Sequence, residues 1–254
     1  MSENKDQHHH FQKAGIYDLL ANYYKYSDPN KHIAYYQKHL KYIHLAAHSM
    51  RTNSLPQPNG AMYPAKVRFI HASTDASNVD IYVNSIKVLK DLPYKEVSDY
   101  LTLPTGKYQV DIYPAGTMVS TILSRKIIIA QGKCYTFIAT GVVKNLKWVV
   151  LEDEPHVPHG ETKIRFIHLS SDTPAVDIAV KNRDIIFSNI SFRKFTSYLG
   201  LFPMTVDLEA RVAGSNNIAL SIPQLKLEKN KIYSILIVGS VTDDPELEAI
   251  LILG

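Results

Sequence analysis

The sequence predicts a mostly β protein, in which two tandem antiparallel immunoglobulin-like β-sandwiches follow an α-helical hairpin. Eighteen residues are written in closely similar form twice, as KVRFIHASTDASNVDIYV from Lys66 and as KIRFIHLSSDTPAVDIAV from Lys163. Within both copies, apolar and polar residues alternate with the two-residue period of a strand. Ahead of Lys66, apolar and aromatic residues recur every three or four positions, which is the period of a helix. These observations predict one helical segment and two copies of one β domain.

The composition is typical of a folded protein and narrows the classes of partner. The 254 residues are 45% hydrophobic and 20% charged, enough to bury two cores of ordinary size. The 28 basic residues are spread among 24 acidic ones without a long basic run, so we expect no nucleic-acid partner. No stretch is apolar over the roughly 18 residues that a membrane span needs, and residues 1–15 lack the apolar core of a signal peptide. We therefore expect synthesis in the cytoplasm, without a membrane span or a cofactor.

Residues 1–50 form a Tyr/His-rich segment, for which we predict the helical hairpin. Helical spacing starts at Phe11 and is interrupted once, where Asp28 is followed by Pro29. An Asp before a Pro is typical of a capped helix start, so a second helix is expected from there. The apolar faces predicted from the spacing are Ile16, Leu19, Leu20 and Tyr23 on the first helix and Ile33, Tyr36, Leu40, Ile43 and Ala47 on the second.

The rest of the chain divides into a linker, two β domains and a joint. Residues 51–65 are rich in Pro, Asn and Ser and are expected to be a linker. Turn residues such as Pro104-Thr105-Gly106 divide residues 66–154 into about seven or eight short strands, as in a β-sandwich. Residues 155–162 form a short joint that contains two prolines, and residues 163–254 form the second sandwich. Because no helical crossover separates the strands, a parallel α/β sheet is disfavoured.

Each copy of the repeat contains a polar corner, His71 with Asp75 in the first and His168 with Asp172 in the second. These residue types suit a general base or a ligand, so a catalytic or binding role is one interpretation. The other is structural, because a histidine at the end of an apolar strand face can hydrogen-bond the backbone of the turn that follows. A catalytic site seldom needs two copies in one chain. We therefore interpret the four residues as structural turn corners and predict no catalytic residue.

Two pairs of opposite charge also repeat. Arg68 and Asp80, matched by Arg165 and Asp177, lie on the polar sides of consecutive strands. We expect each Arg to form a cross-strand ion pair with its Asp, worth about 0.2 to 1 kcal/mol. Their expected role is to hold the register of the strands.

Histidines give two weak candidates for a metal site, and we predict no metal. His44 and His48 stand one helical turn apart, and His156 and His159 lie in the joint beside acidic residues. No Glu follows His44 in the pattern of zinc proteases, and the chain's one cysteine leaves no set of Cys ligands. A loop is also a poor cage for a metal ion.

The helical segment holds more tyrosines than a two-helix hairpin can bury by itself. They are expected either to pack on the neighbouring sandwich or to form an exposed surface for assembly. In the second case the partners are other proteins or further copies of this chain. The candidate assembly residues are Tyr23, Tyr24, Tyr35 and Tyr36.

Aromatic and acidic residues of the first sandwich suggest a ligand surface as the alternative. Aromatic rings and carboxylates are the side chains that bind sugars, so a glycan is the expected ligand. The candidate residues are Tyr82, Tyr94, Asp99 and Tyr100.

Three motifs of the first copy resemble the DUF4397 domain family. They are RFIHASTDASNVDIY from Arg68, VSDYLTLPTGKY from Val97, and Pro114-Ala115-Gly116. The resemblance implies a bacterial β-domain that often occurs in tandem on secreted or surface-attached proteins and has no agreed activity. The second copy departs from the pattern at Gly200, where GLFPMT replaces LPTG. The Tyr/His-rich segment also resembles variants from spore-forming Bacillus relatives, which implies deposition on the spore surface.

These features lead to three ranked hypotheses of function. The first is a non-catalytic structural or adhesive protein of a spore- or cell-surface layer, which associates through its helical segment. The second is a module that binds a glycan or another ligand. The third is a hydrolase of unfamiliar type, which ranks last because the common sequence motifs of enzymes are missing.

Overall fold

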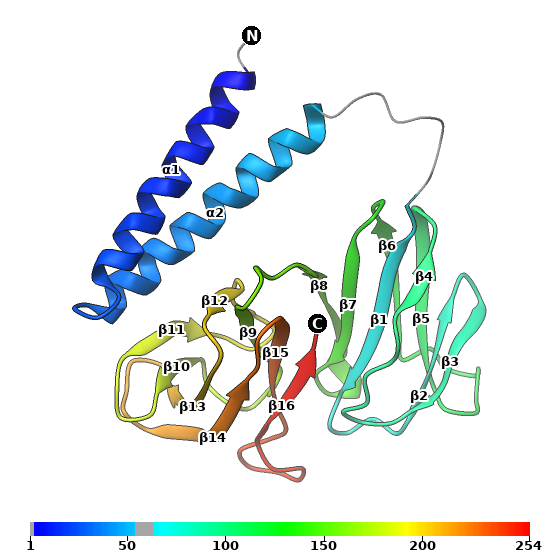
Figure 1. The fold of residues 1–254 in the computed structure, drawn as a ribbon. Helices are drawn as coiled ribbons and strands as arrows, with labels where there is room; N and C mark the ends of the chain where they lie inside the picture. Colours follow the sequence, from blue (N-terminus) through cyan, green and yellow to red (C-terminus); the bar gives the residue numbers. More distant parts are fainter. Residues whose placement is uncertain (1–2, 54–62) are drawn as a thin grey trace. The chain divides into compact units, whose positions relative to one another are not determined.

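The computed structural model describes the backbone of residues 3–53 and 63–254 and the side chains of residues 9–46 and 63–254. Helices occupy the first backbone range and strands the second (Figure 1), which confirms the predicted mostly β class. None of the helices so described is long and apolar enough to cross a membrane. The chain divides into a helical unit and a β unit.

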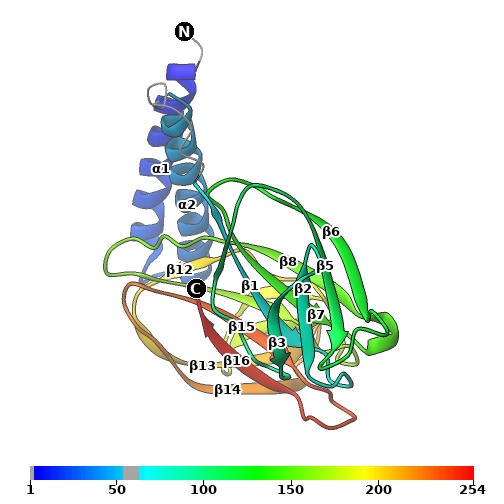
Figure 2. The ribbon, with the colours of Figure 1, turned by 90° about the vertical axis from the view of Figure 1, so that its right-hand side faces the viewer.

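The helical unit is a hairpin of α1 (Glu3–Tyr24) and α2 (Pro29–Asn53), which lie side by side and run in opposite directions (Figures 1 and 2). Asp28 accepts a hydrogen bond from the backbone N–H of Lys31 (3.1 Å) and pairs with its ammonium group (3.0 Å). Asp28 therefore caps α2, which begins at the predicted Asp-Pro pair. Most of the predicted linker, residues 54–62, lies outside the described residues.

The predicted inner face of α1 is wrong. Ile16, Leu19 and Tyr23 are exposed, and Leu19 keeps 71% of its surface in water. Ala14 and Ala21, which stand two turns apart, are buried instead. Alanine adds little bulk, so it lets the helices approach each other closely along this line.

Tyrosine and histidine rings also pack between the two helices. The ring of Tyr17 stacks on those of Tyr35 and Tyr42, with centroids 6.2 and 5.5 Å apart. The rings of His32 and His39 each bond a backbone carbonyl oxygen of α1, at 2.8 and 3.0 Å. Stacking and ring hydrogen bonds thus select the inner face, whereas the prediction weighed aliphatic spacing.

The first sandwich consists of two four-stranded sheets with the orders β4-β1-β7-β8 and β3-β2-β5-β6. Its strands are β1 (Ala65–Ala72), β2 (Val79–Val83), β3 (Ile86–Leu92), β4 (Leu101–Leu103), β5 (Gly106–Pro114), β6 (Leu123–Ile129), β7 (Cys134–Thr140) and β8 (Lys147–Asp153). A short 3-10 helix, Val143–Asn145, connects the last two strands.

The second sandwich repeats the first strand for strand, with the sheets β12-β9-β15-β16 and β11-β10-β13-β14. Its strands are β9 (Thr162–His168), β10 (Val176–Val180), β11 (Ile185–Ile190), β12 (Leu199–Leu201), β13 (Met204–Val212), β14 (Ile218–Leu227), β15 (Lys231–Val238) and β16 (Glu248–Leu253). Two copies of one domain are expected to share their strand order in this way.

One strand pairing in each sandwich is parallel. β1 runs parallel to β7, with Arg68 opposite Thr136, and β9 runs parallel to β15, with Arg165 opposite Ser234. Strands that follow each other directly, such as β7 and β8 or β15 and β16, pair antiparallel as predicted. Alternation along a strand fixes which side chains share a face but not the direction of its neighbour, so the pattern could not indicate the parallel pairs.

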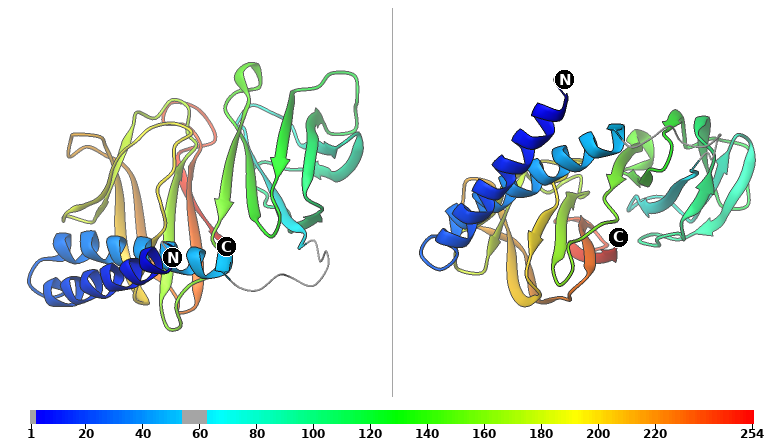
Figure 3. Two further views of the ribbon diagram at one scale, coloured as in Figure 1. Left: turned by 90° about the horizontal axis from the view of Figure 1, so that it is seen from above. Right: turned by 45° about the horizontal axis from the view of Figure 1, so that its top comes forward.

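A buried layer lies between the two sandwiches, in addition to the core inside each. In β1, Val67 and Phe69 belong to the core of the first sandwich, whereas Ile70 and Ala72 lie on the opposite face. That face packs against the sheet that contains β9 and β15 (Figures 1 and 3). The apolar residues of this inter-sandwich layer are Ile70, Ala72, Ile138, Val149, Leu151, Ile167, Leu169, Leu236, Val238 and Ile252. Burial on both faces explains why apolar residues occupy successive positions in these strands, as at Phe69-Ile70 and Phe166-Ile167.

Candidate functional site

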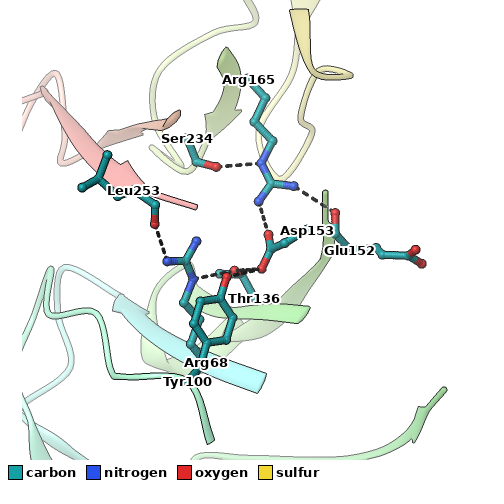
Figure 4. Close-up of polar contacts among 8 residues, drawn as sticks. All are labelled: Arg68, Tyr100, Thr136, Glu152, Asp153, Arg165, Ser234 and Leu253. Carbon is teal, nitrogen blue, oxygen red and sulfur yellow. Dashed lines mark hydrogen bonds and ion pairs between the residues drawn. The ribbon is translucent and has the colours of Figure 1, made fainter. Parts of the chain in front are cut away.

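A cluster of polar side chains, most of them buried, lies between the two sandwiches (Figure 4). Both sandwiches contribute to it. Its members, which we name the Arg–Asp cluster, are Arg68, Tyr100, Thr136, Asp153, Arg165 and Ser234. Arg68 precedes Phe69 on β1, so its side chain leaves the strand on the face opposite the core. Arg165 repeats this position on β9, and both guanidinium groups therefore enter the layer between the sandwiches.

Asp153, the last residue of β8, joins the members of this cluster. Its Oδ2 accepts hydrogen bonds from the hydroxyls of Tyr100 (2.8 Å) and Thr136 (2.6 Å), and its Oδ1 accepts one from Nη2 of Arg165. Arg165 also donates to Ser234 Oγ (2.8 Å) and to the backbone oxygen of Glu152 (3.2 Å). Asp153 is 5% exposed and Arg165 is 2% exposed. The ion pair therefore links the two sandwiches where water does not compete for it.

Arg68 enters the cluster without a carboxylate of its own. Its Nε donates to Thr136 Oγ1 (2.9 Å), and its Nη1 donates to the backbone oxygen of Leu253 in the other sandwich (2.5 Å). The guanidinium lies 4.6 Å from the ring centroid of Tyr100, and that of Arg165 lies 4.5 Å from the ring centroid of Tyr198. The cluster thus buries two cations around one carboxylate. Removing one partner of such a buried pair typically costs about 3–5 kcal/mol.

The tyrosines of the cluster are held in their neutral form. Burial raises the pKa of Tyr100, and the negative charge of Asp153 raises it further. Burial also raises the pKa of Tyr198. A general acid or base works best with a pKa near the operating pH, and these shifts move the pKa values of both tyrosines further above neutral pH. The chemistry of the cluster therefore favours a structural joint.

The predicted cross-strand pairs between Arg68 and Asp80 and between Arg165 and Asp177 are wrong. In each sandwich, the Arg and the Asp lie on strands of different sheets. Asp80 instead accepts hydrogen bonds from Lys87 Nζ (2.6 Å) and from two backbone N–H groups. One feature of the sequence could have indicated the correct partners, because Arg68 shares its strand face with the apolar residues Ile70 and Ala72. An apolar outer face indicates that another surface covers it.

The first polar corner is bonded to the backbone around it. The Nε2 of His71 donates to the carbonyl oxygen of Ser77 (3.1 Å), while its Nδ1 faces the backbone N–H of Ser73 (3.4 Å). Ser73 Oγ donates to the carbonyl oxygen of Gly141 (2.6 Å), whose φ of 103° suits a glycine. Asp75 Oδ1 accepts from the N–H of Val143 and shares the one hydroxyl proton of Ser73 with the carbonyl oxygen of Gly141. These bonds tie the loop after β1 to the loop after β7.

The second corner uses the same residues for the same connection. His168 Nε2 donates to the carbonyl oxygen of Pro174 (3.0 Å), and Asp172 binds the loop after β15 through Ser240, Val241 and Thr242. Burial lowers the pKa of both His71 and His168, so both rings are neutral at pH 7. Burial acts to raise the pKa of Asp172, but its hydrogen bonds outweigh that effect and lower it.

The candidate ligand surface of the first sandwich does not assemble. Tyr82 is 5% exposed, and its ring packs edge-on against Tyr113, with centroids 5.2 Å apart. Tyr100 belongs to the Arg–Asp cluster. Tyr94 is half-buried, burial raises its pKa to about 12, and its ring meets that of His71. Asp99 is exposed. The expected platform is therefore corrected, because the side chains of Tyr82 and Tyr100 are used inside the fold.

The candidate metal and assembly residues lie in different surroundings. His44, His156 and His159 are exposed, and the side chain of His48 lies outside the described residues. Within the described part of the chain, no group of three or more His, Cys, Asp or Glu residues is placed to hold a metal ion. Of the candidate assembly residues, Tyr23 is exposed, Tyr24 and Tyr35 stack on each other inside the hairpin, and Tyr36 is half-buried.

Comparison with known families identifies the first part of the β unit. Residues 65–179 match the family described as "Domain of unknown function (DUF4397)", which confirms the resemblance seen in the sequence. The match spans the first sandwich and the first two strands of the second. Among curated proteins, none matches this chain.

Several solved structures show low similarity to the chain. The C-terminal domain of AlgF from P. aeruginosa is 10% identical with a TM-score of 0.30, over 37% of this chain and 99% of that one. The Bacillus anthracis TIE protein is 13% identical with a TM-score of 0.25, over 70% of this chain and 34% of that one. A fimbrial assembly protein from Parabacteroides distasonis is 9% identical with a TM-score of 0.23, over 74% of this chain and 94% of that one.

Proposed function

We propose that this chain, which carries a DUF4397 domain, is a non-catalytic structural or adhesive protein of a surface layer. Its two sandwiches act as one rigid body. The observation that carries the proposal is the inter-sandwich layer, in which apolar residues from both sandwiches pack together and the buried ion pair of Arg165 and Asp153 joins the two sandwiches. A body of this kind holds its outer loops at fixed separations, which suits a building block of an assembly.

The use of the polar side chains also supports a structural role. His71 and His168 are 1% and 0% exposed, and each donates to a backbone carbonyl oxygen, so burial keeps both imidazoles from reaching a substrate. The hydroxyls of Ser73 and Ser170 are bonded to groups of their own corners. Nucleophilic catalysis needs a hydroxyl activated by a neighbouring base, and within the described residues neither of these hydroxyls donates a hydrogen bond to a histidine.

The helical unit is the part that we propose for association with other proteins or further copies of the chain. Ile16, Leu19 and Tyr23 of α1 are exposed, together with Tyr26 after the helix. Large exposed apolar side chains that lie along one helix face are typical of interaction surfaces. The location proposed for the protein is the outer layer of a cell or spore.

The proposed role is tested by following the whole chain, fused to a fluorescent protein, through growth and sporulation of its source organism. We expect fluorescence at the cell or spore periphery and recovery of the chain in the insoluble surface fraction. A variant in which Leu19 and Tyr23 are both replaced by Ser should shift toward the soluble fraction. Uniform fluorescence throughout the cell, with a soluble monomer at every stage, would contradict the proposal.

A ligand-binding module is the second candidate function. The observation that favours it is a hollow on the first sandwich beside Asp75, at the end of the domain where the polar corner lies.

A further inference from the structure

The two polar corners differ in how they use their carboxylates. In the second sandwich, Asp172 Oδ1 accepts from Ser170 Oγ (2.9 Å). Its Oδ2 accepts from Ser240 Oγ, from the N–H groups of Val241 and Thr242, and from Thr242 Oγ1, at 2.6 to 3.1 Å. Both oxygens of Asp172 are therefore occupied by groups of the protein.

In the first sandwich, only one oxygen of the matching residue is used. Asp75 Oδ1 accepts from the N–H of Val143 (2.9 Å) and shares the hydroxyl proton of Ser73 (3.1 Å) with the carbonyl oxygen of Gly141. Within residues 9–46 and 63–254, no group donates to its Oδ2. The two bonds to Oδ1 hold the carboxylate in one orientation, and Asp75 is exposed. A charged acceptor in a fixed orientation is thus left open to a ligand.

The open carboxylate lines a hollow of about 520 Å³ in the surface of the first sandwich. Ser77, Ser120 and Thr121 contribute hydroxyl groups to the wall, and Pro114 and Ile122 contribute apolar surface. A volume of this size falls within the range of about 300–1,000 Å³ that is usual for small-molecule sites.

A longer loop in the first sandwich builds part of this wall. Residues 115–122 connect β5 to β6, whereas residues 213–217 make the matching connection from β13 to β14, which is eight residues against five. The extra length carries Ser120 and Thr121 to the hollow. It also carries Val119, which is 94% exposed. The copy that leaves its carboxylate open is therefore also the copy that has the additional wall.

We propose that this hollow binds a neutral carbohydrate, with Asp75 Oδ2 accepting hydrogen bonds from sugar hydroxyl groups. Serine and threonine hydroxyls both donate and accept, as recognition of a polyol requires, and the apolar wall suits the C–H face of a sugar ring. No basic side chain lines the hollow, which disfavours an anionic ligand. One carboxylate is too few for a typical cation site. The inference rests on the proposed adhesive role, to which it gives a class of ligand.

The test is a titration of the isotope-labelled full-length chain with glucose, galactose, mannose and N-acetylglucosamine, followed by amide NMR. We expect at least one sugar to cause saturable shifts at residues 75–77 and 119–122, with a dissociation constant in the millimolar range. The amides around Asp172 should not move. Calcium chloride is titrated in parallel, and saturable shifts of the same residues with calcium but with none of the sugars would overturn the proposal.

Two matched variants make the test specific. Asp75→Asn keeps an oxygen for Ser73 and Val143 but turns an amide N–H₂ toward the hollow, so sugar binding should weaken about tenfold or more, as expected when a hydrogen bond to a charged group is lost. Asp172→Asn should leave sugar binding unchanged in the folded protein. Binding that is unaffected by Asp75→Asn, or the absence of any sugar-dependent shift in the folded wild-type chain, would overturn the proposal.

These results separate the site from the proposed function. If no sugar binds but the fluorescent fusion still reaches the surface layer, the carbohydrate site is wrong and the adhesive role stands. If a sugar binds at the hollow but the fusion stays soluble throughout the cell, the site stands and the surface role is wrong.

Discussion

The two sandwiches are alike where they are buried and unlike where they meet water. Each places an arginine on the outer face of its first strand and a histidine at the end of that strand. The two aspartates of the corners, by contrast, differ in their surroundings. Asp172 is bonded through both oxygens, whereas Asp75, which lines a hollow, is bonded through one. This comparison teaches that the duplicated contacts hold the fold together, while the loops around them are free to differ.

The largest expected effect is at the buried contact between the sandwiches. Asp153→Leu leaves the guanidinium groups of Arg165 and Arg68 without a buried carboxylate, so we expect the free energy of unfolding to fall by about 3–5 kcal/mol. Urea unfolding followed by the fluorescence of Trp148, the one tryptophan of the chain, measures this. The matched control is Glu154→Gln, which breaks the more exposed pair with Lys163 and should change stability by less than about 1 kcal/mol. Equal effects of the two variants would show that the buried pair does not join the sandwiches.

The second prediction compares the two corners directly. Asp172→Asn turns an amide N–H₂ toward the four donor groups that surround Oδ2, so we expect a loss of about 1–3 kcal/mol. Asp75→Asn can keep its two internal bonds and turns the amide toward water, so its loss should be below about 1 kcal/mol. Urea unfolding of both variants measures the difference. Equal losses would contradict the difference between Asp172, which is bonded through both carboxylate oxygens, and Asp75, which is bonded through one.

The third prediction concerns the neutral histidines that both corners share. Burial lowers the pKa of His71 and His168 in the folded chain, whereas an unfolded histidine titrates near 6.5. Below that pH the unfolded state binds more protons than the folded state, so stability falls as the pH decreases. The limiting slope is about 1.4 kcal/mol per pH unit for each histidine. Unfolding midpoints measured at pH 7.0, 6.0 and 5.5 should decrease, and the decrease should be smaller in His168→Gln. A flat profile would mean that the two histidines have the same pKa in the folded and the unfolded chain.

The smallest expected effect lies in the loop that distinguishes the first sandwich. Val119 is almost fully exposed, so Val119→Ser should change the free energy of unfolding by no more than about 0.5 kcal/mol. Phe69→Ala in the core of the same sandwich is the contrasting variant and should cost about 3–5 kcal/mol. Thermal unfolding of both variants measures the contrast. A large loss in Val119→Ser would show that the longer loop is part of the fold.

Much of the fold followed from the sequence, because it depends on patterns within short segments. The alternation after Lys66 and Lys163 predicted the strands, and the repeat predicted two domains with matching corners. The Asp-Pro pair predicted the start of α2. These features rest on periodicity and turn chemistry, which neighbouring residues determine.

The missed features depend on how folded surfaces meet. The partners of Arg68 include Thr136 and the backbone of Leu253, both far away in the sequence, so no local pattern pairs them. The buried Tyr82 was predicted to be exposed, because alternation does not show whether the second face of a sheet is covered. The inner face of α1 was missed because stacked tyrosine rings outweighed aliphatic spacing. The open oxygen of Asp75 could be recognised only by comparing the geometry of the two copies.

The central claim is that the two sandwiches form one rigid body, and matched probes in the two sandwiches test it most directly. Phe69 and Phe166 occupy the same position on β1 and β9, and both are fully buried. With 4-fluorophenylalanine at one site or the other, ¹⁹F NMR during urea unfolding reports each sandwich separately. We predict that both native signals disappear over the same range of urea concentration, as in a single cooperative transition. Loss of one signal at a distinctly lower urea concentration than the other would contradict the claim.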